Sequence, residues 1–183
     1  WDTITAGSWA DKWDISVGSM TITTARQKAL YFTTPYYYTP AQFAAAADSG
    51  IATLEDLNGK AICVGVSTTY ESWLNHDLAS LGLPESSIYA QPPENVTVVP
   101  LESDQDCAQA IAAARPEFQI YFTSDTVVDS NIANGLPVVK VGSPAYSEDL
   151  AVAIDRTHKL DATSLVSKLD EAVKAMHSDS TLT

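Results

Sequence analysis

The chain has 183 residues, of which 23 are acidic and 10 are basic, and its formal net charge is −13. This length supports one large domain or two small lobes, and a hydrophobic content of 45% excludes a disordered chain. The net charge repels phosphate and no Lys/Arg cluster offsets it locally, so nucleic acid is not an expected partner. The longest apolar stretches, such as 43–47, fall far short of the ~20 residues that a membrane helix needs.

The two ends of the sequence suggest a processed or truncated piece. The chain starts at Trp1 rather than Met, and residues 180–183 follow directly on a helical pattern. We therefore expect that a targeting segment, if the precursor has one, cannot be read from this chain.

Short apolar runs of strand length recur along the chain between turn signals. The dipeptide Asn58-Gly59 precedes one run, and Pro100 is expected to end another. The expected strands are 15–17, 30–32, 42–47, 61–64, 96–99, 119–122, 138–141 and 150–154.

Segments of helical period lie between these runs. The expected helices are 70–81, 104–115, 124–134 and about 161–177. Residues 67–69 offer N-cap chemistry to the first helix, and Asn134-Gly135 is a C-cap signal for the third. The last helix carries an apolar stripe of Leu165, Leu169, Val173 and Met176. The alternation predicts α/β layers with mostly parallel sheets.

Three polar segments follow expected strands, and each admits two interpretations. Residues 19–26 end in Arg26, whose planar fork matches a carboxylate, although a helix cap followed by a solvated arginine is the simpler interpretation. Residues 67–69 could offer N–H donors to an anion or merely cap the next helix. Asp125 could receive an ammonium group or only favour the helix dipole.

Catalytic and metal chemistry find little support in the sequence. It contains no nucleophile elbow, and its His, Cys and Asp residues lack the spacing of a metal site. His76, His158 and His177 lie in polar surroundings, where solvated surface positions are expected. We therefore predict no catalytic residue, no metal and no cofactor.

The segment 13–26, WDISVGSMTITTAR, continued by residues 30–37, resembles the signature of family 3 extracellular solute-binding proteins, the polar amino-acid receptors of ABC importers. Weaker segments agree in order over the rest of the chain, among them 54–60, 122–125 and 150–154. The resemblance implies an α/β fold of the type II periplasmic-binding-protein class, with two lobes joined by crossing strands and an amino acid held in the cleft. Mapped here, residues 1–42 and 144–183 form a first lobe that is incomplete, and residues 43–143 form the second.

The resemblance also implies a set of ligand-binding residues. Arg26 matches the arginine that clamps the ligand carboxylate, Thr21 a donor to the same group, and Asp125 the acid that pairs with the ammonium. Thr68 and Thr69 match a second-lobe pair that closes on the carboxylate, although Ser67 stands where the family usually has glycine. The remaining members are Gly18 and Ser19, which line the two charged ends, and Trp1, which matches an aromatic that stacks on the ligand side chain.

The implied partners are a free L-amino acid, polar or charged, and an ABC transporter permease, with a monomeric receptor when full length. The implied location is periplasmic or extracellular after a signal peptide is removed, with a lipid anchor at the cell surface as one option. Cys63 and Cys107 are either two unrelated buried thiols or, in an exported chain, one disulfide; we predict the disulfide, because both fall in the second lobe. It requires Cα atoms within ~7 Å of one another.

Two other function classes remain open at this point. The same lobes occur as ligand-binding modules of membrane sensors or ligand-gated channels. An enzyme on this scaffold, a dehydratase or a lyase, would need a carboxyl group that does not pair with the ammonium. Glu71 is the nearby residue that could supply it.

Overall fold

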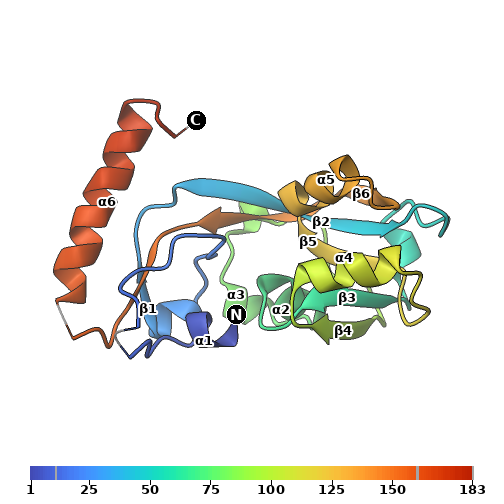
Figure 1. Ribbon diagram of the computed structural model, residues 1–183, viewed down its shortest axis with the longest axis horizontal. Coiled ribbons are helices and arrows are strands. Elements are labelled where there is room, and N and C mark those ends of the chain that lie inside the picture. Colours follow the sequence, from blue (N-terminus) through green and yellow to red (C-terminus); the bar gives the residue numbers. More distant parts are fainter. Residues whose placement is uncertain (11, 160, 183) are drawn as a thin grey trace. The chain divides into compact units, whose positions relative to one another are not determined.

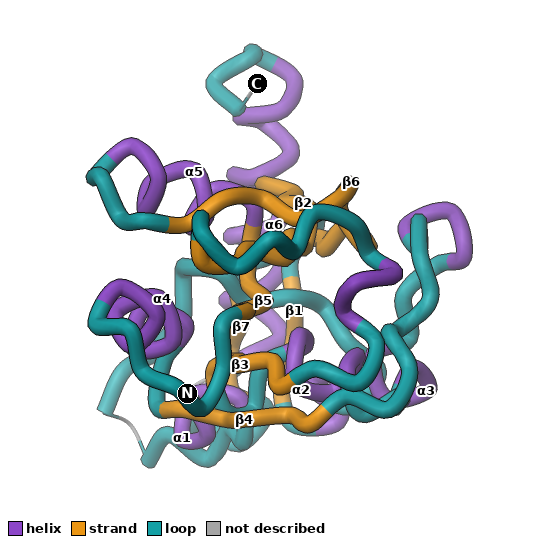
Figure 2. The backbone as a smooth tube through the Cα atoms, turned by 90° about the vertical axis from the view of Figure 1, so that its right-hand side faces the viewer, coloured by secondary structure: helices purple, strands orange, loops and turns teal. Residues whose placement is uncertain are grey.

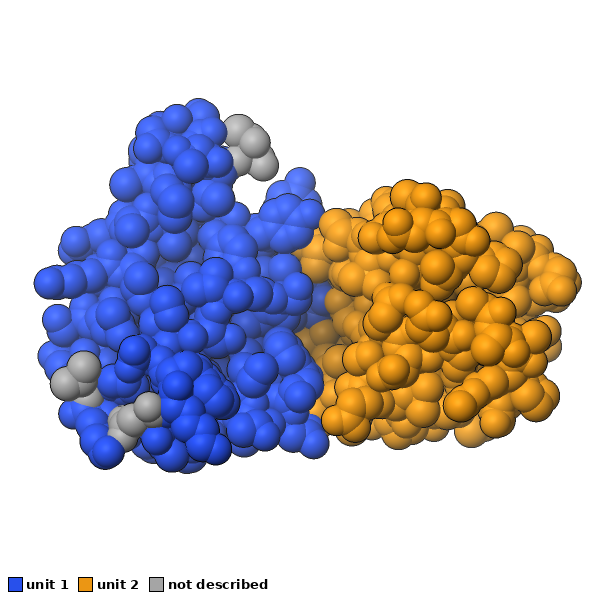
Figure 3. Space-filling view, viewed as in Figure 1, with its two compact units in different colours: residues 1–38, 79–82, 148–183 blue, residues 39–78, 83–147 orange. Residues whose placement is uncertain are grey.

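A computed structural model describes residues 1–10, 12–159 and 161–182. The chain divides into two compact units, which Figure 3 colours separately. Unit 1 comprises residues 1–38, 79–82 and 148–183, and unit 2 comprises residues 39–78 and 83–147. None of the helices in the described ranges is long and apolar enough to cross a membrane.

Unit 2 is built on a five-stranded sheet with strand order β4-β3-β5-β2-β6, which Figure 2 shows from β4 at the bottom to β6 at the top. Its strands are β2 (Tyr37–Ala46), β3 (Ala61–Gly65), β4 (Thr97–Leu101), β5 (Ile120–Ser124) and β6 (Val138–Leu150). Strand β3 runs parallel to both β4 and β5, whereas β2 runs antiparallel to β5. The carboxyl ends of β3, β4 and β5 therefore meet at one edge of the sheet, where α/β proteins place their ligands.

Helices cover both faces of this sheet (Figure 1). They are α2 (Thr69–Leu74), α4 (Asp104–Ala112) and α5 (Asp125–Ala133). Unit 2 also contains the short 3-10 turns η2 (Glu55–Leu57) and η3 (Glu85–Ser87). Because side chains alternate along a strand, Tyr121 joins the core under α4 and α5 while its neighbour Phe122 packs against Trp73 of α2. Burial on both faces explains why β3 and β5 read as continuous apolar runs.

Unit 1 contains a smaller antiparallel pair of strands, β1 (Leu30–Phe32) and β7 (Ala153–Asp155). Its helical segments are α1 (Asp2–Thr5), the 3-10 turn η1 (Arg26–Lys28), residues 79–81 of α3 (Leu78–Leu81) and α6 (Ala162–Ser178). Leu30 and Ala153 pack with Trp9 and Met20, and Ile154 packs under α6. The expected stripe of α6 is confirmed at Leu165, Leu169 and Val173, which face this core or are buried.

The structure corrects several expected elements. The helix expected over 70–81 is divided into α2 and α3, because Asn75 ends α2 and His76 has a left-handed φ of +59°. Only a single bridge, Ser16 to Ala153, forms where a strand was expected over 15–17. The sheets are not mostly parallel, because the five-stranded sheet is mixed and the β1-β7 pair is antiparallel.

Two further corrections concern the ends of strands. Strand β4 continues through Pro100 to Leu101, which is tolerated because β4 lies at the edge of its sheet. The runs expected at 138–141 and 150–154 belong to one long strand, β6, followed by β7.

Helix α6 is tied to the rest of unit 1 by Asp170. This carboxylate pairs with Lys174 at 2.6 Å and accepts a hydrogen bond from the backbone N–H of Thr34. The ion pair with Lys174, followed by the bonds from Thr34, lowers the pKa of Asp170 from 3.8 to about 2. A carboxyl group with a lowered pKa stabilises the folded state above its unfolded pKa and loses that contribution as the pH falls toward the folded value.

Replacing Asp170 with asparagine should therefore lower the free energy of unfolding at pH 7 by about 1 kcal/mol. The difference from the parent should persist at pH 5 and shrink as the pH falls below about 4. Urea unfolding at pH 7, 5 and 3 measures it, with Glu171→Gln as an exposed control on the same helix. An equal effect of Asp170→Asn at all three values would contradict this role.

Candidate functional site

The eight residues singled out from the sequence fall into two sets, one in each unit. Trp1, Gly18, Ser19, Thr21 and Arg26 belong to unit 1, and Thr68, Thr69 and Asp125 belong to unit 2. Each set is described within its own unit.

Arg26 opens η1 and is 7% exposed despite its charge. Its Nη1 donates to the carbonyl oxygen of Thr21 at 3.1 Å, and its backbone N–H donates to Thr23 Oγ1 at 3.1 Å. The guanidinium carbon lies 5.4 Å from the centre of the Trp1 ring, within the range of a cation–π contact. Three of the predicted residues, Trp1, Thr21 and Arg26, are therefore brought together.

Glu148 is a fourth member of this cluster that the sequence analysis did not single out. Its side chain on β6 is buried, and Thr21 Oγ1 donates to its Oε1 at 2.9 Å. The alternation of side chains along β6 could have shown that Glu148 points inward, because the buried residues Tyr146 and Leu150 share its face of the strand. Thr21 thus contacts a guanidinium through its carbonyl and a buried carboxyl group through its hydroxyl.

Gly18 and Ser19 lie on the surface of unit 1. The Gly18 carbonyl accepts hydrogen bonds from the backbone N–H of Met20 at 2.8 Å and from the hydroxyl of Tyr36. Burial raises the pKa of Tyr36, so this phenol stays protonated as a donor at neutral pH. The Ser19 hydroxyl has no hydrogen-bond partner within the described ranges.

In unit 2, Thr68 caps helix α2 in a reciprocal arrangement with Glu71. The Thr68 hydroxyl accepts from the backbone N–H of Glu71 at 3.2 Å and donates to the carbonyl of Gly65 at 2.7 Å. Glu71 Oε2 in turn accepts from the backbone N–H of Ser67 at 2.6 Å, which completes a capping box. Ser67 adopts a left-handed φ of +58°, the conformation for which glycine would be preferred. Thr69 follows and is buried.

Asp125 is the first residue of α5 and is not isolated. It forms an ion pair with Lys140 of β6, and Lys140 also pairs with Asp129 at 2.8 Å. Burial works against the charge of Lys140, but the bonds to Asp125 and Asp129 outweigh it and raise the pKa of the lysine. Two carboxylates around one ammonium leave the group with a net charge of −1.

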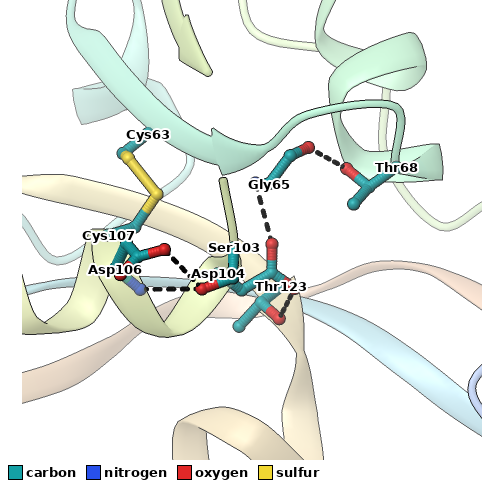
Figure 4. The surroundings of a disulfide bond; sticks show 8 residues. All are labelled: Cys63, Gly65, Thr68, Ser103, Asp104, Asp106, Cys107 and Thr123. Carbon is teal, nitrogen blue, oxygen red and sulfur yellow. Dashed lines mark hydrogen bonds between the residues drawn. A yellow bond between two sulfur atoms is a disulfide. The ribbon is translucent and has the colours of Figure 1, made fainter. Parts of the chain in front are cut away.

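Asp104 is a second carboxyl group at the same edge of the sheet, and the sequence pattern around it predicted only the start of a helix. It begins α4, and it accepts hydrogen bonds from the Gly65 backbone N–H at 2.8 Å and from Thr123 Oγ1 at 2.7 Å (Figure 4). Burial raises its pKa, against the opposing effect of these two bonds. Asp104 therefore fastens the ends of β3 and β5 to the start of α4.

The predicted disulfide between Cys63 and Cys107 is confirmed, with Cα atoms 5.6 Å apart (Figure 4). It joins β3 to α4 in the buried core of unit 2. The disulfide therefore lies about one helical turn from Asp104, close to the edge of the sheet that carries Asp104 and Thr68.

The histidines differ from expectation in one case. The side chain of His158 is only 4% exposed and its Nε2 lies 2.8 Å from Asp14 Oδ1, so the expected solvated position is wrong. The chain turns directly after β7, where the backbone N–H of His158 donates to the carbonyl of Asp155 at 3.3 Å. No group of three His, Cys, Asp or Glu side chains suited to a metal occurs in the described parts of the chain.

Comparison with known proteins gives a family match along the chain. The model of the bacterial extracellular solute-binding proteins, family 3, matches residues 1–183. The L-cystine-binding protein TcyJ of Escherichia coli (strain K12) is 32% identical over 80 residues, which are 43% of this chain and 30% of that protein. The match therefore spans less than a third of that curated relative.

Solved structures show the same fold. An ancestral arginine-binding protein bound to arginine gives a TM-score of 0.77 at 22% identity, over 99% of this chain and 73% of that one. The ancestral amino acid-binding protein AncCDT-1, a precursor of cyclohexadienyl dehydratase, gives 0.75 at 22% identity, over 100% and 71%. These likenesses confirm the expected α/β fold of the type II periplasmic-binding-protein class.

Proposed function

We infer that this chain, which belongs to family 3 of the bacterial extracellular solute-binding proteins, binds a free L-amino acid outside the cytoplasm as the receptor of an ABC importer. The observation that carries the proposal is the cluster of Arg26, Thr21 and Trp1 in unit 1. The known ligands of the similar proteins, cystine and arginine, support an amino acid as the ligand class.

The carboxylate end of the ligand is assigned to Arg26. A guanidinium is a planar fork of N–H donors whose geometry and charge match a carboxylate, and the bond from Nη1 to the Thr21 carbonyl holds that fork in place here. The low exposure of Arg26 strengthens such a charge-assisted bond, because little water screens it. The hydroxyl of Ser19 and the ring of Trp1 are the further contacts proposed in unit 1.

The ammonium end is assigned to Asp125 in unit 2. The single positive charge of Lys140 offsets only one of the two carboxylates, Asp125 and Asp129, that pair with it. These three side chains together therefore keep the negative charge that attracts an ammonium. Thr68 and Thr69 at the start of α2 are proposed to contact the ligand carboxylate instead, and the Thr68 hydroxyl also caps that helix.

An enzyme is the second candidate, and the likeness to AncCDT-1 favours it, since that protein is a precursor of cyclohexadienyl dehydratase. The carboxyl group that was open for such chemistry, Glu71, is engaged in the capping box. We therefore propose a binding protein without catalysis. Mass spectrometry of the ligand after prolonged incubation with the protein tests this, since an unchanged mass is expected and loss of water or carbon dioxide would support an enzyme.

A thermal-shift screen against the twenty L-amino acids tests the ligand class. A ligand present at about 100 times its Kd should stabilise the protein by about 2.7 kcal/mol, a shift of several degrees. D-enantiomers at the same concentration serve as controls. If none of the twenty raises the melting temperature, the proposed ligand class is wrong.

Replacing Asp125 with asparagine should weaken amino acid binding by about 30-fold or more, because removing one partner of a close charge pair costs ~2–5 kcal/mol. Asp129→Asn is the matched control, since Asp129 pairs with the same lysine but its side chain is 61% exposed. Titration calorimetry on both variants should find the larger loss for Asp125→Asn. Equal affinities for the two variants would remove Asp125 from the site.

A further inference from the structure

The chain returns to unit 1 for four residues, Ala79–Gly82, which we call the α3 tip. Two hydrogen bonds fasten it there. The backbone N–H of Thr24 donates to the carbonyl of Leu81 at 3.3 Å, and the backbone N–H of Ala25 donates to the carbonyl of Ser80 at 3.1 Å. The α3 tip therefore contacts the two residues that directly precede Arg26.

These two hydrogen bonds restrict the backbone that sets the direction of the Arg26 side chain. Ala25 is the N-cap of η1, and Arg26 is its first residue. A turn this short has few internal hydrogen bonds to hold its own start, so outside acceptors for its first N–H groups restrict the direction of the chain. The Arg26 side chain leaves the backbone one residue beyond the held pair.

Gly82 permits this close approach. Its φ of +61° lies in the left-handed region, and a Cβ placed on it would overlap the hydroxyl of Thr24 and lie 3.2 Å from the Thr24 Cβ. A side chain at position 82 would thus push the α3 tip away from Thr24. Gly59 has a similar φ of +71° but no atom within 4 Å of the position of a Cβ. A substitution at Gly59 therefore measures the effect of backbone strain alone, whereas the same substitution at Gly82 adds the clash with Thr24.

We propose that the α3 tip is a positioning element for Arg26: by holding Thr24 and Ala25 it fixes the guanidinium in the orientation that recognises the ligand carboxylate, and Gly82 is the residue that makes this contact possible. The proposal rests on the proposed function of Arg26 as the carboxylate clamp. The α3 tip acts through Arg26 and not by touching the ligand.

The test measures discrimination between an amino acid and its carboxamide, which lacks the carboxylate charge. Calorimetry gives the ratio of the two Kd values for the parent, for Gly82→Val and for the control Gly59→Val, using whichever L-amino acid gives the largest thermal shift. We expect the ratio to fall about tenfold in Gly82→Val, which corresponds to about 1.4 kcal/mol of lost carboxylate recognition. It should stay within about twofold of the parent in Gly59→Val, since loss of stability alone weakens both ligands alike.

A second pair of variants covers the case that Gly82→Val does not fold. Gly82→Ala should lower the ratio less, and adding Thr24→Ala should restore it, because the second change removes the hydroxyl that the new Cβ meets. If the parent does not discriminate between acid and carboxamide, the proposed function of Arg26 fails. If the parent discriminates but Gly82→Val does so as well as Gly59→Val, or Thr24→Ala restores nothing, this inference alone is overturned.

Discussion

Replacing Arg26 with lysine is expected to weaken amino acid binding by about 30-fold, although the charge is kept. An ammonium is a compact charge that cannot present two parallel donors to a carboxylate, and it cannot hold the Thr21 carbonyl at the same time in the planar geometry of Arg26. Losing part of a close charge pair places the change at the lower end of the ~2–5 kcal/mol range. Titration calorimetry with the best amino acid measures the loss.

The matched control is Arg115→Lys, which changes an exposed arginine in unit 2 in the same way. Its affinity should equal that of the parent. Circular dichroism on both variants separates a loss of binding from a loss of fold. If Arg26→Lys binds within threefold of the parent, Arg26 is not the carboxylate clamp and serves only to hold the structure of unit 1.

Removing the disulfide should cost about 4 kcal/mol of unfolding free energy. Cys63 and Cys107 are 44 residues apart, and cross-linking a loop of that length removes about this much chain entropy from the unfolded state. Both residues lie in the buried core, so the Cys63→Ala and Cys107→Ala double variant also loses packing around α4. Urea unfolding followed by the fluorescence of the buried Trp73 reports on unit 2.

Two comparisons make the disulfide result interpretable. The parent protein should titrate no free thiol when unfolded without reductant, and two after reduction. The Ser103→Ala variant, which loses the N-cap of the same helix, should cost only about 1 kcal/mol. A double-alanine variant as stable as the parent would show that the cross-link does not constrain unit 2.

Local patterns predicted most of the elements because local chemistry decides them. The N-cap residues Ser103, Ser124 and Asp161 each accept hydrogen bonds from their own helices. The disulfide could be predicted because the chain has only two cysteines, so that a single pairing is possible once an exported protein is expected. The end of β4 was predicted wrongly because it depends on tertiary packing. A proline such as Pro100 is tolerated in an edge strand, and the position of β4 at the edge is known only from the assembled sheet.

The candidate site divides in the same manner. Arg26 and Thr21 were predicted from one continuous motif, and the structure brings them into contact. Glu148 is 127 residues from Thr21 and Lys140 is 15 residues from Asp125, so neither contact follows from a local pattern. Contacts between residues that are far apart in the chain need tertiary structure to be recognised, and here they place a carboxyl group beside Thr21 and an ammonium beside Asp125.

The most direct test of the account is calorimetric titration of the protein with one matched set of ligands. The set comprises the L-amino acid with the largest thermal shift, its carboxamide and its N-acetyl derivative. Because Arg26 is assigned to the carboxylate and Asp125 to the ammonium, both derivatives should bind at least 30-fold more weakly than the amino acid. Equal binding of the three compounds would contradict the claim that the protein recognises a free amino acid by its two charged ends.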